Sequence, residues 1–348
     1  IGVDTYFGHI NAEGGIAGRK LKLVPLDDGY EPAKALANMH ELHDKHKAFA
    51  IIGNVGTPTT EKTLPFALDK QLIFFGAFTG APLLRKDPPD KYVFNFRASY
   101  EEETAAMFSY LVDIKKIKPQ QIAVFAQQDG YGDAGFRGVA KTMRKHGGDP
   151  DKILRVGHER NKTDVNDAVQ KIAASPDIVA VIMVSTYRPA SLFIQKVKDA
   201  RAAKGAAKDL IFANVSFVGS NPLADELSQM GPKYAEGVIV TQVVPHINSQ
   251  AAAVSKYRDL LAKYHPNAKP NFVSLEGYLD AVVFVEGLKR VNGKLTSDSL
   301  VAALESINNL DLGIGAPIHF GPSEHQASHK VWGTILDSAG KYQVLELD

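Results

Sequence analysis

The sequence predicts an α/β protein built of two doubly wound, Rossmann-like lobes. Short runs rich in Val, Ile, Ala and Phe alternate with helical patterns along most of the 348 residues. These runs do not alternate apolar with polar residues, which is typical of parallel strands buried on both faces. Repeated β-α units form parallel sheets with crossover helices. The chain holds more such units than one domain of about 150 residues uses, so we expect two lobes.

The individual elements follow from the period of the apolar residues. Apolar runs predict strands at residues 20–28, 48–53, 72–78, 121–127, 152–159, 178–185, 210–216 and 236–244. Helical periodicity predicts helices at residues 3–15, 31–46, 57–71, 101–116, 131–147, 164–176, 188–205, 252–266, 272–293 and 296–308. Pro32 and Pro58 each stand in the first turn of a predicted helix, where proline is favoured.

Composition excludes several classes of protein. The net charge is +1, which gives no electrostatic reason to bind nucleic acid or an anionic membrane. The chain has no cysteine, which excludes disulfides, thiolate nucleophiles and cysteine-bound metals. No apolar run reaches the about 18 residues that a membrane span needs. We expect no cofactor and no metal.

Ligands of open α/β sheets bind at the carboxyl ends of the strands, so the loops that follow the strands are the candidate site. These loops are rich in Thr, Ser, Tyr, Asn and Gly, and Asp129 is their single carboxylate. They comprise residues 53–57, 76–82, 126–132, 184–189 and 213–220.

Two of these loops have the features of an anion site. Thr57 is predicted as the N-cap of a helix and Pro58 as its first residue, and a helix N-terminus presents unpaired amides and a partial positive charge. Thr79 adds a hydroxyl to a second loop of small residues, which let the backbone approach a ligand closely. The alternatives are that Thr57 only caps its own helix and that Thr79 only bonds its own backbone.

Tyr131 and Tyr187 each follow a strand of the predicted second lobe. A tyrosine in this position can cover an apolar ligand and offer it a hydroxyl, or it can simply pack in the core.

Two further motifs give weaker hypotheses. Residues 130–135, GYGDAG, match the dinucleotide fingerprint, but polar residues separate them from the strand and a clean acidic ribose-binding residue is missing. His40, His43 and His46 have helical spacing that can hold zinc, within a charged segment that is typical of a solvated helix face. A nucleotide-dependent enzyme that uses the GYGDAG motif is the alternative from another class of protein.

Six stretches, spread along much of the chain, together carry a family resemblance: "INAEGGIAGRKLKLVPLDDGYEP", "IIGNVGTPTT", "LIFFGAFTGAPLLR", "IAVFAQQDGYGDAGF", "VSTYRPASLFIQKVKDA" and "AEGVIVTQVVP". In this order and spacing they resemble the periplasmic substrate-binding proteins of branched-chain amino acid (Leu/Ile/Val) ABC transporters. The resemblance is specific because of the number and order of the stretches rather than any single one.

The resemblance implies the type I periplasmic binding protein fold, in which hinge closure captures a ligand in the cleft between two lobes. It places lobe I at residues 1–98 plus 245–325, and lobe II at residues 99–244 plus 326–348. Three crossovers join the lobes, near Arg97–Tyr100, Gln242–Pro245 and His325–Trp332.

The resemblance also assigns site residues. Gly56 and Thr57 match the helix N-terminus that binds the α-carboxylate of the ligand, without a buried arginine. The neighbouring loop supplies backbone groups to the carboxylate and the ammonium, and Tyr131 and Tyr187 close over the ligand from the second lobe. The loop residues are Ala77, Phe78 and Thr79.

Three departures from the family pattern bear on the ligand. Relatives that bind Leu, Ile and Val carry an acid that holds the ammonium where this chain has Ser216 and Phe217. One possibility is that Glu276 supplies that acid. The other is that Glu276 is an exposed acid of a first helical turn and that the ligand has no ammonium group, in which case Phe217 forms a wall of the pocket. Some relatives join the positions of Tyr30 and Gly56 by a disulfide, and here both cysteines are absent.

The third departure concerns the first lobe. The family begins with a strand and a ligand-facing loop ahead of the helix at residues 3–15. We expect that segment to be missing because the sequence starts late, which would leave unpaired backbone in the first lobe.

The resemblance therefore implies a non-enzymatic, periplasmic receptor that binds leucine, isoleucine or valine and presents it to ABC transporter permease subunits, most simply as a monomer. The alternative is the same fold binding an aromatic or aliphatic carboxylic acid, or an amide, without an ammonium group.

Overall fold

The computed structural model describes residues 1–206 and 208–348, which divide into two compact units. Unit 1 comprises Ile1–Ala98 and Ile247–Lys330, and unit 2 comprises Ser99–His246 and Val331–Asp348. The chain passes between the units after Ala98, His246 and Lys330, and the boundaries that the resemblance implies lie after residues 98, 244 and 325.

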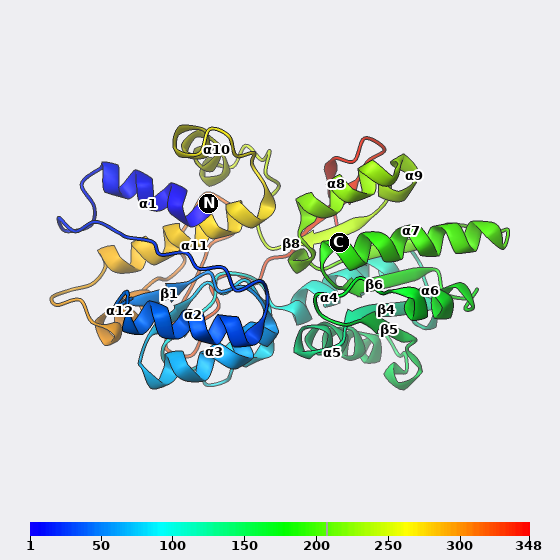
Figure 1. Cartoon of the computed structure of the whole chain (residues 1–348), viewed down its shortest axis with the longest axis horizontal. Helices are drawn as coiled ribbons and strands as arrows, with labels where there is room; N and C mark the ends of the chain where they lie inside the picture. The colour runs from blue at the N-terminus through cyan, green and yellow to red at the C-terminus, as the bar shows by residue number, and fades with distance from the viewer. Residues whose placement is uncertain (207) are drawn as a thin grey trace. The chain divides into compact units, whose positions relative to one another are not determined.

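Unit 1 is built on a parallel sheet with the strand order β1-β2-β3. Helices α1 and α11 pack on each other, as do α2 and α3, and Figure 1 shows the two pairs on opposite sides of β1. The buried core on the α2–α3 side contains Met39, Ile51, Leu64 and Phe74. The elements are α1 (Gly2–Ala12), α2 (Pro32–Asp44), β1 (Ala50–Ile52), α3 (Thr57–Asp69), β2 (Ile73–Phe75), η1 (Pro82–Leu84), β3 (Val93–Phe94), α10 (Ala252–Tyr264), α11 (Phe272–Lys289) and α12 (Ser297–Glu305).

Unit 2 is built on a sheet with the order β10-β9-β8-β7-β6-β4-β5. Strands β4 to β8 pair in parallel, as predicted, and β9 and β10 add an antiparallel edge. Its elements up to β6 are α4 (Tyr100–Ser109), η2 (Tyr110–Ile114), η3 (Pro119–Gln121), β4 (Ile122–Gln127), α5 (Gly130–Lys145), η4 (Pro150–Lys152), β5 (Arg155–His158), α6 (Asn166–Ala173) and β6 (Ala180–Val184). The remainder are α7 (Tyr187–Ala203), β7 (Ile211–Asn214), η5 (Ser216–Val218), α8 (Ser220–Met230), α9 (Pro232–Ala235), β8 (Ile239–Gln242), β9 (Trp332–Leu336) and β10 (Tyr342–Leu345).

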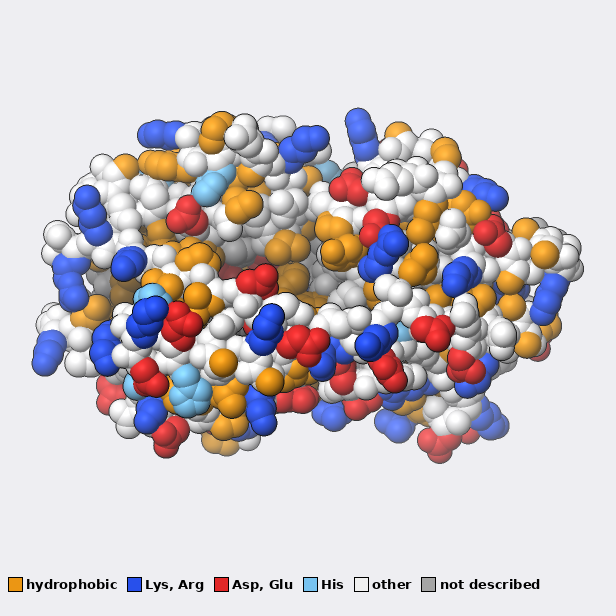
Figure 2. Space-filling view, viewed as in Figure 1, with side chains coloured by type: hydrophobic (Ala, Val, Ile, Leu, Met, Phe, Trp, Pro, Cys, Tyr) orange, Lys and Arg blue, Asp and Glu red, His pale blue; other side chains and the backbone are white. Residues whose placement is uncertain are grey.

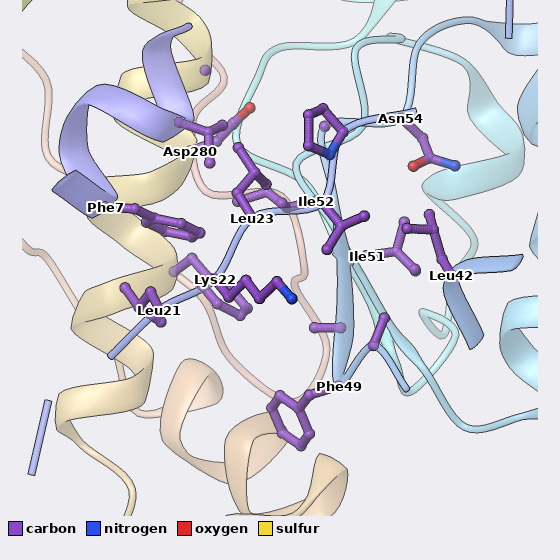
Figure 3. A pocket seen from close by; sticks show the side chains of 18 of the residues that line it. Phe7, Leu21, Lys22, Leu23, Leu42, Phe49, Ile51, Ile52, Asn54 and Asp280 are labelled. Atoms are coloured by element: carbon purple, nitrogen blue, oxygen red, sulfur yellow. The ribbon is translucent and has the colours of Figure 1, made fainter. Parts of the chain in front are cut away.

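Residues 20–28, predicted as a strand, form no strand in the structure. This stretch and the outer edge of β1 flank a cavity of about 1200 Å³. Figure 3 shows Leu21, Leu23, Ile51 and Ile52 around it. A strand exists only as part of a hydrogen-bonded ladder, and within the described residues nothing pairs with this stretch.

The surface carries both signs of charge. On the face that Figure 2 shows, basic and acidic side chains are interspersed rather than gathered by sign. Among residues 1–206 and 208–348, no helix has both the length and the apolarity that crossing a membrane requires.

The glycines of the GYGDAG motif have a packing role in unit 2. A β-carbon on Gly132 would overlap the carbonyl oxygen of Gln127 at the end of β4, and one on Gly135 would overlap the side chain of Val184 on β6. These glycines let α5 approach the sheet closely, which accounts for the motif without a dinucleotide.

We predict that Gly132→Ala lowers the free energy of unfolding by about 2 kcal/mol or more, because backbone atoms must move to admit the methyl group. Gly277→Ala is the matched control, since Gly277 lies inside helix α11 and a β-carbon there would come no closer than 3.6 Å to its nearest neighbour, Val3. Because alanine favours a helix, that variant should be neutral or up to about 1 kcal/mol more stable. Urea denaturation measures both, and equal effects would contradict the packing role.

Candidate functional site

The loops after β1 and β2 meet in unit 1. The N–H of Phe78 donates to the carbonyl of Asn54 at 2.7 Å, and the N–H of Gly56 donates to the carbonyl of Phe78 at 3.1 Å. These bonds continue the parallel pairing of the two strands beyond their ends. The two stretches that the sequence singles out as an anion site therefore lie side by side.

Helix α3 begins at Thr57, and Gly56 rather than the predicted Thr57 is its N-cap. As a glycine, Gly56 has no side chain that could cap this helix, and the hydroxyls of Thr59 and Thr60 both donate to its carbonyl. The N–H groups at the start of this helix can therefore donate to an acceptor from outside it, and the helix dipole favours a negatively charged one.

Gly56 is the residue that this corner requires. Its φ is +101°, a conformation that side chains disfavour. The ring of Tyr30 and the hydroxyl of Thr59 occupy the place where a β-carbon would stand.

The two threonines of the predicted site contact each other. The Oγ1 atoms of Thr57 and Thr79 lie 2.7 Å apart, and both residues are buried. Thr57 does not cap its own helix, whereas Thr79 does bond its own loop, because the N–H of Ala81 donates to Thr79 Oγ1 at 3.2 Å. A pair of hydroxyls thus lies at the uncapped start of α3.

A buried arginine lies beside this corner. Arg97 follows β3 and is 1% exposed. Its guanidinium carbon lies 5.1 Å from the centre of the Phe78 ring, and its Nε lies 3.2 Å from Oε1 of Glu276. Sequence reasoning missed Arg97, although a lone arginine at the end of an apolar strand was a usable signal.

Glu276 is buried, not an exposed acid of a first helical turn. It stands one turn from Asp280 on α11, and both residues are 3% exposed. Burial raises the pKa of the Asp280 carboxyl well above its ordinary value, the nearby Glu276 adds to this, and Arg97 opposes it. The ion pair means that Arg97 already compensates the acid proposed for a ligand ammonium.

Gly76 brings the second loop against this cluster. A β-carbon on Gly76 would come within 2.7 Å of the Asp280 carboxyl carbon, and its φ of +60° also favours glycine. Two contacts therefore fix the position of the loop of Ala77, Phe78 and Thr79. Gly76 lets the start of the loop approach Asp280, and the guanidinium of Arg97 packs on the ring of Phe78.

In unit 2, Tyr131 is fully buried. Its hydroxyl donates to the carbonyl of Ser185 at 2.8 Å, and its ring lies 5.1 Å from Tyr100 and 4.8 Å from Phe217. Tyr187 instead is the first residue of α7 and is 41% exposed. The structure thus brings Tyr131 and Phe217 together and leaves Tyr187 on the surface, and their role in binding stays a prediction.

Glu103 is a second residue that sequence reasoning missed. It lies in the first turn of α4, in a run of acids that is typical of a solvated surface, yet it is fully buried. Its carboxylate accepts hydrogen bonds from the N–H of Ser216 at 2.9 Å, from Ser216 Oγ at 3.1 Å and from Thr241 Oγ1 at 2.8 Å. A carboxylate therefore does reach the loop at Ser216 and Phe217, but from a helix earlier in the chain.

The three helical histidines of unit 1 have other contacts. The rings of His40 and His43 pack against Phe66, and His46 contacts Glu41. Within residues 1–206 and 208–348, no group of three histidine or acidic side chains is arranged to hold a metal.

Known proteins resemble the chain over nearly its whole length. The model of a family described as periplasmic binding protein matches residues 1–341. A solved structure of a possible leucine/isoleucine/valine-binding protein from Rhodopirellula baltica is 41% identical, with a TM-score of 0.91 over 99% of this chain and 90% of that one.

Curated relatives match at lower identity. An amino acid binding protein of Pseudomonas aeruginosa is 26% identical over 67% of this chain and 58% of its own length. A Leu/Ile/Val-binding protein of Escherichia coli is 24% identical over 69% of this chain and 61% of its own length. The chain thus spans about three fifths of the length of the curated relatives it matches.

We predict that Glu276→Gln lowers the free energy of unfolding by about 3 kcal/mol, because it removes the carboxylate that faces the buried Arg97. The control is Glu286→Gln on the same helix, whose partner Arg290 lies at 2.8 Å and whose side chain is about one third exposed. An exposed pair of this kind contributes at most about 1 kcal/mol. Chemical denaturation of the two variants compares them, and similar losses would argue against the buried pair.

Proposed function

The chain belongs to the periplasmic binding protein family, and from that premise we propose that it is the extracytoplasmic receptor of an ABC importer for leucine, isoleucine or valine. The family consists of ligand-binding receptors, and the names of the relatives from R. baltica, P. aeruginosa and E. coli support an amino acid as the ligand. In this proposal the protein binds its ligand without converting it and presents it to permease subunits.

The observation that carries the proposal is the uncapped start of α3. Its first-turn amides and the hydroxyl pair of Thr57 and Thr79 form a neutral donor cluster that suits a carboxylate. Hydrogen bonds to a charged group contribute about 1.5–3 kcal/mol each. A micromolar dissociation constant corresponds to about −8 kcal/mol, which a few such bonds and one buried apolar side chain supply.

A second candidate is a carboxylic acid or amide without an ammonium group. Two observations favour it: Arg97 compensates Glu276 in unit 1, and the loop with Ser216 and Phe217 has no acid of its own. The carboxylate of Glu103, which contacts Ser216, favours the amino acid instead. Direct comparison of ligands decides between the two candidates.

We predict that leucine, isoleucine or valine raises the melting temperature in a panel that also holds the corresponding keto and hydroxy acids. A ligand at 100 times its dissociation constant stabilises the folded protein by about 2.7 kcal/mol, which a thermal-shift assay detects. Stabilisation by the keto acids alone would replace the amino acid with the second candidate. If neither series stabilises the protein, the proposed ligand class is wrong.

We predict that Thr57→Val weakens carboxylate binding by roughly 10- to 100-fold, because it removes a hydroxyl at the start of α3 while keeping the shape of the side chain. Thr63→Val is the control, since Thr63 is also buried on α3 and its hydroxyl donates to the carbonyl of Thr59. Isothermal titration calorimetry measures both, and an unchanged affinity in Thr57→Val would remove this residue from the site.

A further inference from the structure

Arg85 follows the short η1 helix, and its guanidinium bonds to three separate segments of unit 1. Nη1 donates to the carbonyls of Thr79 at 3.3 Å and Ala81 at 3.0 Å. Nη2 donates to the carbonyl of Arg97 at 3.1 Å, and Nε donates to Oε1 of Gln326 at 2.7 Å. The first segment is the loop of the candidate site, and the other two are those through which the chain leaves unit 1 after Ala98 and Lys330.

The two leaving segments pair with each other. The N–H of Asn95 donates to the carbonyl of His325 at 2.7 Å, and the carbonyl of Asn95 accepts from Ala327 at 2.8 Å. The N–H of Ser328 donates to the carbonyl of Phe96 at 2.9 Å. The segments thus form one short parallel pair, and Arg85 joins both of its members to the loop.

We infer that Arg85 is a positioning residue that links the ligand loop at Thr79–Ala81 to these two connections. A guanidinium is planar and holds its N–H groups in a fixed fork, so it cannot follow one acceptor without tilting away from the others. A shift of the loop carbonyls on ligand binding is therefore passed to the backbone at Arg97 and to the side chain of Gln326. The inference rests on the proposed function for the nature of the ligand, but the link itself is a property of unit 1.

The link is tested first without ligand, by amide hydrogen exchange. Arg85→Gln should raise exchange by about tenfold in residues 77–85, 95–98 and 325–330 together, because all three segments lose a shared partner. Arg290→Gln is the control, since Arg290 bonds Glu286 and the carbonyl of Ser306 and touches none of these segments. Faster exchange confined to residues 77–85 would overturn the inference. If Arg85→Gln does not fold, Arg85→Lys carries the same test, because lysine keeps the charge and loses the fork.

A second measurement uses Trp332, the single tryptophan, which opens β9 directly after the third passage between the units. Valine, leucine and isoleucine are titrated into the protein while Trp332 emission is recorded, and calorimetry gives the affinity.

We expect Arg85→Gln to weaken the affinity for the ligand about tenfold and to reduce the emission change at saturation, with Arg85→Lys between it and the parent chain. Weaker binding with a full emission change would contradict the link, as would a loss of stability alone. If the parent chain binds none of these ligands, the proposed function fails and the exchange result alone decides the inference.

Discussion

The structure of the candidate site depends on the hydrogen bonds that join the loop after β1 to the loop after β2. Phe78 exchanges backbone bonds with Asn54 and Gly56, and these bonds fix the start of α3 against the neighbouring loop. Thr57 and Thr79 can share a hydrogen bond only because the two loops are held in this register. This register requires glycine at positions 56 and 76, because a larger residue would collide with Tyr30 at the first position and with Asp280 at the second.

Buried charge is the second constraint on unit 1. A buried guanidinium is stable only when carboxylates and aromatic faces surround it, and Arg97 has Glu276 on one side and Phe78 on another. The Phe78 ring therefore belongs both to the candidate site and to the packing of the first connection between the units. Under the proposed function, a ligand ammonium at this corner would meet a Glu276 whose charge Arg97 already balances.

In unit 2 a buried carboxylate is stabilised by hydroxyl and backbone N–H donors instead of an arginine. Glu103 is buried, and it accepts hydrogen bonds from Ser216 and Thr241 rather than lying in solvent with the acids beside it. This arrangement orients the turn that carries Phe217, which in turn packs against Tyr131. The contact between Tyr131 and Phe217 thus depends on Glu103, which the sequence pattern does not distinguish from the exposed acids beside it.

The sequence by itself determined the fold class, because strand runs that are apolar on both faces and alternate with helices leave parallel sheets as the solution. It also singled out the loops after β1 and β2, since Gly, Thr and Pro at a strand-to-helix junction have strong local preferences. Tertiary structure alone decided that Gly56 is the N-cap residue of α3, that residues 20–28 form no strand, and that Arg97, Glu103 and Glu276 are buried. The reason is physical: local preference depends on neighbours in the chain, whereas a strand needs a partner and a buried charge needs a counter-group, and both come from distant residues.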